Sequence, residues 1–283
     1  DKSISSFVNG FEKQSGYFNQ YFDEDSDKVY IEVPNTENEF LYYTSLARGL
    51  GSNDIGLDRG RLGSEHVLRF EKHGNKLLLI ESNYDYRAVS DDPLEQKAVE
   101  ESFAKSVHYG FEIEAKSETS FLIDLTPFIV RDAVDAARSI ARSNEGNYRF
   151  DPSRSALYKE MTKNFPENSE FETIITLTGT KPGRNLRQVV PTSSAVTMHQ
   201  HHSFVKLPDA SGYKMREYDP RIGYLGISYY DYASAISEPI EKRFTSRHRL
   251  KKKDPTAAQS EAVEPIIYYM DRGAPEPIRS ALM

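Results

Sequence analysis

The sequence contains no cysteine and no tryptophan. The absence of cysteine excludes disulfides, thiolate nucleophiles and cysteine-ligated zinc sites. No run of about 18 apolar residues occurs, so the sequence predicts no membrane-spanning helix. An excess of positive charge is also missing. The net charge of -7 argues against general binding to nucleic acids, which depends on concentrated lysine and arginine.

The composition is that of a chain that can bury a sizeable core. Its 283 residues are 38% hydrophobic and 12% aromatic, and this length suits one large domain or two ordinary ones. The aromatic residues include 18 tyrosines and 15 phenylalanines. They favour a strand-rich protein, because aromatic rings suit the pleated, half-buried surface of a sheet.

Hydrophobic periodicity predicts strands along most of the chain. Apolar and polar residues alternate from 103 to 115, and a hairpin turning at Gly74-Asn75 is predicted over 66–82. Other strands are predicted near 17–34, 39–46, 170–179, 195–207, 223–233 and 241–250. Helical spacing predicts short helices over 3–15 and from Pro93, and the clearest helix over about 127–143. The predicted fold is α+β and strand-rich, with largely antiparallel sheets or a meander and a few short helices.

The pattern also suggests an organisation into domains. A linker is predicted at 251–264, where charged and small residues show no periodicity. We therefore expect a β-rich N-terminal accessory domain over 1–250 and the start of a C-terminal domain over 265–283. The helix predicted from Pro277 would be too short to be stable alone, since isolated helices below about 12 residues are marginal in water. We expect the natural protein to continue beyond Met283.

Three of the seven histidines fall within four positions of a predicted strand. Alternate side chains of a strand share a face, so His199 and His201 should point one way and His202 the other. An H-x-H pair on a strand is half of a metal site, and His199 and His201 are the candidate ligands. The sequence indicates no third ligand, and H-E-x-x-H is absent. The competing interpretation is a hydrogen-bonded core residue at His202 and a polar sheet face at the other two.

The sequence does not match the motifs of nucleotide-binding, nucleic-acid-binding or serine-hydrolase sites. The glycine-rich stretch 48–63 lacks the third glycine of a dinucleotide fingerprint, because that position is Asp54, and it has no Gly-Lys-Ser/Thr. Its simplest interpretation is an ordered connection in which Asp58 and Arg59 pair with neighbours, and the alternative is a loop that contacts a ligand or another domain. The basic cluster at 242–253 contains a single aromatic residue, Phe244, so nucleic-acid stacking is not supported. No G-x-S-x-G elbow occurs.

Seven segments, in order along the chain, carry a resemblance to a known family: IGLDRGRLG (55–63), SFAKSV (102–107), FPENSEFE (165–172), HHSFVKLPD (201–209), YDPRIGYLG (218–226), RHRLKKKDP (247–255) and EPIIYYMDRGAPEPIRSAL (264–282). They resemble the N-terminal part of large bacterial zinc-dependent metalloproteases of the Bacteroidetes type, whose catalytic domain is metzincin-like. The role of that N-terminal domain is not defined.

The resemblance implies a function for the parent protein rather than for this chain. In the family, three histidines of H-E-x-x-H-x-x-G-x-x-H hold zinc and the glutamate is the general base. This chain lacks that motif, so we expect no catalytic residue and no metal or cofactor in it. Zinc would lie in the missing catalytic domain, whose peptide and protein substrates the parent would cleave.

We therefore expect a non-catalytic domain that packs on the C-terminal protease domain and shapes access to it. Asp58, Arg59, His201, His202, Asp219 and Arg221 are the candidate domain-contact or ligand residues. The chain begins at Asp1 without a leader-like segment, which favours an exported protein that has lost its leader. We expect it to be periplasmic, outer-membrane-associated or extracellular.

Two alternatives remain open. Tyrosine-rich strands would suit a stand-alone extracellular module that binds protein or glycan, because tyrosine combines apolar area with a polar tip. An exposed cluster of Tyr224, Tyr229, Tyr230 and Tyr232 would favour that alternative. The other is a metal-dependent hydrolase that uses His199 and His201.

Overall fold

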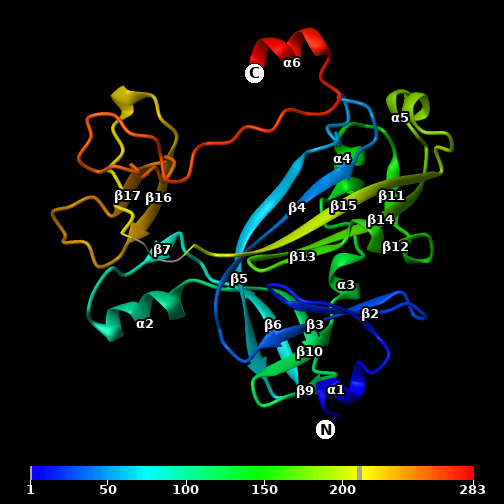
Figure 1. The fold of residues 1–283 in the computed structure, drawn as a ribbon, viewed down its shortest axis with the longest axis horizontal. Helices are drawn as coiled ribbons and strands as arrows, with labels where there is room; N and C mark the ends of the chain where they lie inside the picture. Colours follow the sequence, from blue (N-terminus) through cyan, green and yellow to red (C-terminus); the bar gives the residue numbers. More distant parts are fainter. Residues whose placement is uncertain (1, 209–211) are drawn as a thin grey trace. The chain divides into compact units, whose positions relative to one another are not determined.

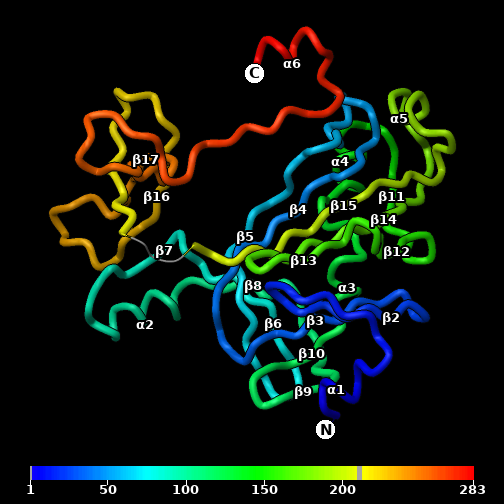
Figure 2. Tube along the Cα trace, in the orientation of Figure 1, coloured from blue at the N-terminus to red at the C-terminus, as the bar shows by residue number. Residues whose placement is uncertain are grey.

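The computed structural model describes residues 2–208 and 212–283. Strands dominate, most of them antiparallel, and the helices are short, which confirms the α+β, strand-rich prediction (Figure 1). The chain forms two compact units. Of the described residues, unit 1 comprises 2–83 and 103–208, and unit 2 comprises 84–102 and 212–283. The chain leaves unit 1 after residue 83, returns at residue 103, and ends in unit 2, a path that can be followed in Figure 2.

A five-stranded sheet contains the first strands of unit 1. Its order is β1-β2-β3-β10-β9, and every neighbouring pair is antiparallel. The acidic turn after Asp23 joins β2 to β3. The strands are β1 (Glu12–Gln14), β2 (Asn19–Asp23), β3 (Lys28–Pro34), β9 (Ala115–Lys116) and β10 (Ser120–Asp124).

A nine-stranded antiparallel sheet forms the larger layer of unit 1. Its main path is β11-β14-β15-β4-β5-β6-β8, and β12 and β13 also pair with β14. The predicted hairpin at Gly74-Asn75 is confirmed by the pairing of β5 with β6. The strands are β4 (Phe40–Arg48), β5 (Leu62–His73), β6 (Lys76–Glu81), β8 (Ser106–Glu112), β11 (Asn147–Phe150), β12 (Ala156–Leu157), β13 (Lys163–Phe165), β14 (Asn168–Thr180) and β15 (Ala195–Lys206).

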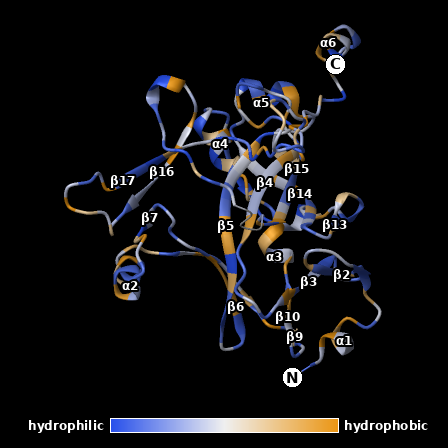
Figure 3. Cartoon of the chain, turned by 60° about the vertical axis from the view of Figure 1, so that its left-hand side comes forward, coloured by the Kyte–Doolittle hydropathy of each residue, from blue (hydrophilic) through white to orange (hydrophobic). Residues whose placement is uncertain are grey.

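The main core of unit 1 lies between these two sheets. On β5, Leu68 and Phe70 alternate with less buried residues and face this core, and the hydropathy of β5 changes along its length in Figure 3. The inward rings pack edge to face or tilted, with centroids 5.0 to 6.4 Å apart around Phe204. The buried residues from both sheets include Phe22, Ile31, Val33, Phe121, Ile123, Phe40, Tyr42, Leu68, Phe70, Leu79, Phe171 and Phe204.

Short helices cover the remaining apolar surfaces of unit 1. Ile140 and Leu186 pack against one end of the large sheet, and Ile4 packs against the outer face of the small one. Two single-turn 3-10 helices precede β12 and β13. The elements are α1 (Ile4–Phe7), α3 (Thr126–Ile129), α4 (Ala136–Arg142), α5 (Arg184–Val189), η1 (Pro152–Arg154) and η2 (Lys159–Met161).

Unit 2 has a small three-stranded sheet of order β17-β16-β7. The predicted helix from Pro93 is confirmed. Residues 251–264, predicted as a linker, lie in this unit and form a closed loop in which the Lys253 ammonium contacts the Glu261 carboxylate at 2.6 Å. No helix in the described ranges is long and apolar enough to cross a membrane. The elements are β7 (Tyr86–Arg87), α2 (Pro93–Ser102), η3 (Pro220–Ile222), β16 (Gly226–Asp231), β17 (Glu241–Thr245) and α6 (Glu276–Leu282).

The helix predicted over 3–15 is wrong in length. Only Ile4–Phe7 is helical, and Glu12–Gln14 forms a strand that pairs with β2. Gly10 adopts a φ of 92°, outside the helical region, and this turns the chain between the two elements. The apolar spacing that suggested a longer helix instead brings Phe7 and Phe11 against the ring of Tyr30.

The helix predicted over 127–143 is two helices, α3 and α4, with a break between them. Backbone N–H groups of Ala133 and Val134 donate to the Gln200 side-chain oxygen at 2.9 and 3.0 Å instead of to a helical carbonyl. The Asp132 carboxylate then accepts from the N–H groups of Ala136 and Ala137 and starts α4. A side chain distant in sequence therefore interrupts a helix whose local pattern is continuous.

Candidate functional sites

His199 and His201 share the outer face of β15, as the alternation predicts. Each is paired with its own glutamate on β14. His199 Nδ1 lies 2.8 Å from a Glu172 oxygen, and His201 Nε2 lies 2.7 Å from a Glu170 oxygen. The second ring nitrogen of His201 lies 3.9 Å from Glu172. The two histidines therefore belong to a polar network of the sheet face, in which each imidazole is hydrogen-bonded to a different carboxylate and Glu172 lies near both.

His202 points to the other face and is fully buried in the main core. Its Nδ1 is hydrogen-bonded to the Tyr42 hydroxyl at 2.9 Å. Burial lowers the pKa of His202 to about 3, and the positive charges of Arg131 and His201 act in the same direction. The imidazole is therefore neutral at physiological pH. Its role in this structure is to join β15 to β4 within the core.

A third set of histidines, which no sequence pattern indicated, lies where β5, β6 and β8 pair in the large sheet. His66 Nδ1 is 2.9 Å from one oxygen of Glu81, and His108 Nε2 is 2.7 Å from the other. The two imidazole centroids are 4.6 Å apart. Burial alone would raise the pKa of Glu81, but the hydrogen bonds with His108 and His66 outweigh it and hold the pKa below its usual value. We call His66, Glu81 and His108 the His-Glu-His cluster.

The predicted contact residues of the glycine-rich stretch lie in a folded loop of unit 1. Leu50 and Leu57 are buried in the loop, and the Leu50 N–H donates to the Leu57 carbonyl at 2.9 Å. The Asp58 carbonyl accepts from the Arg61 N–H, while the side chain of Arg59 is exposed. The loop is therefore an ordered connection between β4 and β5.

The predicted pair Asp219 and Arg221 lies in unit 2, at η3. The Arg221 guanidinium donates three hydrogen bonds to the Asp219 carboxylate, at 2.9, 3.1 and 2.5 Å. These bonds hold the pKa of Asp219 below its usual value. Both groups are satisfied by each other. The structure does not gather them with Asp58, Arg59, His201 and His202 into one described site, because those four residues belong to unit 1.

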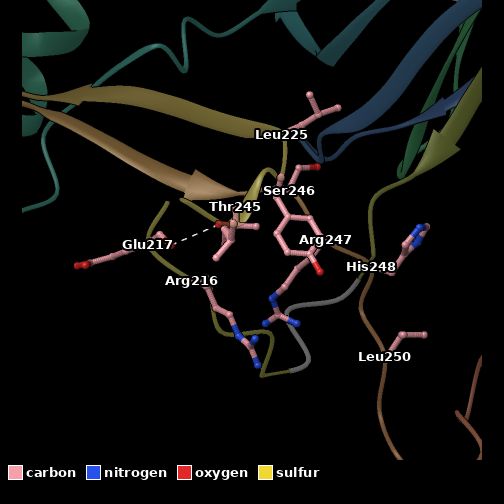
Figure 4. Close-up of a pocket in the computed structure, with 10 residues that line it drawn as sticks. Arg216, Glu217, Leu225, Thr245, Ser246, Arg247, His248 and Leu250 are labelled. Carbon is pink, nitrogen blue, oxygen red and sulfur yellow. Dashed lines mark hydrogen bonds between the residues drawn. The ribbon is translucent and has the colours of Figure 1, made fainter. Parts of the chain in front are cut away.

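Unit 2 also contains a pocket of about 660 Å³, which no sequence motif indicated (Figure 4). Figure 4 shows the side chains of Arg216 and Arg247 extending to the same side, whereas His248 points away. The Arg247 guanidinium lies 4.5 Å from the ring centroid of Tyr213. The pocket thus combines two arginines and one glutamate, Glu217, with an apolar lining. Its arginines are separated by about 30 positions in the sequence, so spacing alone could not have found it.

The tyrosines of β16 are divided between the two faces of the small sheet. Tyr230 stacks on Tyr86 with centroids 5.6 Å apart, and Tyr232 lies 6.3 Å from the same ring. Tyr229 is half-buried on the opposite face, and Tyr224 is exposed in the preceding loop. The three rings of Tyr86, Tyr230 and Tyr232 therefore form one aromatic group, which we call the tyrosine face.

Comparison with known proteins gives one match. A family model described as a domain of unknown function, DUF5117, matches residues 60–253. The matched range includes the His-Glu-His cluster, the β14 and β15 network, and the pocket of unit 2. No curated protein and no solved structure matches the chain.

Proposed function

The chain belongs to the DUF5117 family, a domain of unknown function, and we propose that it is the non-catalytic N-terminal accessory part of a secreted or envelope-associated bacterial zinc metalloprotease. It packs on the catalytic domain and shapes access to the cleft. The catalytic zinc belongs to that other domain, which hydrolyses peptide and protein substrates.

The observation that carries this proposal is the distribution of apolar side chains in unit 2. Every buried apolar residue of the described chain belongs to unit 1, and none belongs to unit 2. Most of the exposed large apolar residues, by contrast, lie in unit 2. In the described ranges, those in unit 1 are Leu62, Val107, Met161, Phe165 and Val189, and the others all lie in unit 2. A body with so little apolar burial of its own is suited to packing on another protein.

The clearest part of this exposed surface is the segment Ile266–Met270. Its tyrosines, Tyr268 and Tyr269, are 88% and 91% exposed, and Ile267 is 63% exposed. Consecutive apolar and aromatic residues in water are unfavourable, at roughly 25 cal/mol for each Å² of apolar surface left unburied. Such residues are typical of a protein interface. This segment is the part of unit 2 that we expect to contact the catalytic domain.

The sequence resemblance supports the identity of the partner. The segments YDPRIGYLG, RHRLKKKDP and EPIIYYMDRGAPEPIRSAL all fall in unit 2. The last one contains Ile266–Met270. The part of the chain that exposes most apolar surface is therefore also a part that resembles the metalloprotease family.

The test measures binding of the chain to a metzincin-like peptidase domain of that family, produced as a separate polypeptide. We expect a one-to-one complex by isothermal titration calorimetry. The double variant Tyr268→Ser, Tyr269→Ser should weaken binding by about tenfold or more, because aromatic anchors dominate interface energies. Leu62→Ser, an equally simple loss of an exposed apolar side chain in unit 1, should leave affinity unchanged. The chain alone, supplied with zinc, should cleave no peptide substrate.

Two results would contradict the proposal: peptidase activity of the isolated chain, or equal affinity of the double variant and the native chain. A second candidate function is an extracellular binding module, which the stacked tyrosine face favours. That function would appear in the same experiments as binding to soluble glycans that is lost in Tyr230→Ala, without any affinity for the peptidase domain.

A further inference from the structure

We propose that His66, Glu81 and His108 bind a divalent transition metal ion, and that zinc is the ion the site suits best. The ligand atoms of these three residues all lie within 4.8 Å of one another. Two imidazoles and one carboxylate are a common zinc ligand set. The proposal is independent of the proposed function, because the zinc of that function belongs to a different domain.

The three ligands come from three adjacent strands of the large sheet. His66 lies on β5, Glu81 ends β6 and His108 lies on β8. The register of β6 with β8 shifts between Leu79 and Ile80, so His108 has no residue directly opposite it. Such a bulge re-aims a side chain. Here it accompanies the approach of the His108 ring to Glu81, while hydrogen-bonded strands hold the backbone of all three ligands.

The distances require only a small change to admit an ion. The nitrogen-to-oxygen distances of 2.9 and 2.7 Å are those of hydrogen bonds without metal. Ligand atoms about 2.0–2.1 Å from a tetrahedral zinc are roughly 3.3 Å apart. The two nitrogens contact different oxygens of Glu81, and the ligand atoms of the three residues all lie within 4.8 Å of one another. Side-chain rotation must therefore bring the two nitrogens and one carboxylate oxygen to that common spacing. The ion then replaces the shared protons and bridges the same three groups.

The surroundings favour a fixed site that an ion can reach. The ring of Tyr42 stacks on His66 with centroids 6.4 Å apart, and Tyr42 is itself hydrogen-bonded to buried His202. The side chains of His66, His108 and Glu81 are 25%, 19% and 30% exposed. Supporting contacts of this kind orient metal ligands. The partial exposure leaves a fourth position for water or for an oxygen or nitrogen of a ligand.

The ligand types select the kind of ion. Imidazole nitrogens suit zinc and its neighbours in the first transition row, whereas magnesium and calcium take oxygen ligands. The ligand atoms of His199, His201 and their glutamates are more widely spaced, because each imidazole is hydrogen-bonded to a different glutamate. Among the residues that the structure describes, no other three potential ligands come as close together.

The test measures metal binding by the whole chain. The chain is stripped with a chelator, titrated with zinc by calorimetry and analysed for bound metal after gel filtration. We expect about one zinc per chain and a rise of roughly 5–10 °C in the thermal midpoint at a free zinc concentration near 100 times the dissociation constant. Cobalt(II) should give the visible absorption of a four-coordinate site.

Matched variants identify the ligands. Glu81→Gln preserves shape and hydrogen-bonding capacity, so it should fold normally in the absence of metal and yet bind zinc at least about tenfold more weakly. His66→Asn and His108→Asn should show the same loss. His73→Asn is the control, because His73 pairs with Glu71 at 2.6 Å on the same hairpin but lies outside the cluster. It should leave affinity and the cobalt spectrum unchanged.

Two outcomes would overturn the proposal. One is a stripped chain that takes up no stoichiometric zinc and shows no thermal shift. The other is zinc that remains bound in Glu81→Gln and His108→Asn but is lost in His201→Ala, which would assign the metal to the β14 and β15 network. Because Glu81→Gln is nearly isosteric, its melting curve without metal separates loss of a ligand from loss of the fold.

Discussion

At the scale of single residues, the most informative group is the buried, neutral His202. Its pKa in the folded chain is about 3, against 6.5 for an ordinary histidine. The folded state thus binds fewer protons than the unfolded state between these values, so folding stability is present above pH 6.5 and falls as the pH falls. The slope for one such group is at most about 1.4 kcal/mol per pH unit.

This linkage predicts that the native chain and His202→Gln differ in how their free energy of unfolding depends on pH. The free energy of unfolding of the native chain, measured with urea and a chelator present, should fall by about 1.6 kcal/mol between pH 6.5 and pH 5 through His202. His202→Gln can keep a hydrogen bond to Tyr42 but removes the titrating group, so its pH slope should be shallower. Equal slopes for His202→Gln and the native chain would show that His202 is not the titrating group.

At the scale of elements, two buried glutamines give opposite predictions. The side chain of Gln200 accepts from two backbone N–H groups in the break between α3 and α4 and donates to the Arg131 carbonyl at 2.5 Å. Gln20 is equally buried, but its amide has no hydrogen-bond partner among the described residues. Gln200→Met should lower the free energy of unfolding by about 2–4 kcal/mol, because it leaves buried donors unpaired.

Gln20→Met serves as the matched comparison. It should be neutral or stabilising by about 1 kcal/mol, because it removes a buried amide that no hydrogen bond compensates. Both values come from urea unfolding under the same conditions. A larger loss for Gln20→Met than for Gln200→Met would show that the split between α3 and α4 does not depend on Gln200.

The same elements show what the sequence could predict. Local periodicity was sufficient for most of the longer strands, for the face of each β15 histidine and for the hairpin at Gly74-Asn75, but not for β1 or the short strands β11, β12 and β13. Counting outward from that turn along both strands pairs Glu81 with Leu68. This pairing places Glu81 near His66. The position of His108 depends on a bulge in β8, which no local sequence pattern indicates. The break in the helix after α3 likewise depends on Gln200, a residue more than 60 positions away.

At the scale of the whole molecule, the two units differ in the source of their stability. Unit 1 contains all the buried apolar residues of the described chain, and unit 2 relies on a small sheet, ring stacking and exposed ion pairs. Stacked rings and surface ion pairs each contribute about 1 kcal/mol or less. Stability in a chain is not uniform, and segments with few buried contacts open first. Unit 2 should therefore open well below the free energy at which unit 1 unfolds.

Hydrogen exchange measures this difference directly. In the isolated chain, amides of β16 and β17 should exchange at least about a hundredfold faster than amides of β14 and β15. Adding the peptidase domain should slow exchange in unit 2 and leave β14 and β15 unchanged, because a partner that covers Ile266–Met270 supplies apolar burial that unit 2 lacks. The double variant Tyr268→Ser, Tyr269→Ser should remove that protection. Equal and slow exchange of β16 and β14 in the chain alone would mean that unit 2 is stable by itself, and the argument from its exposed apolar surface to a protein partner would fail.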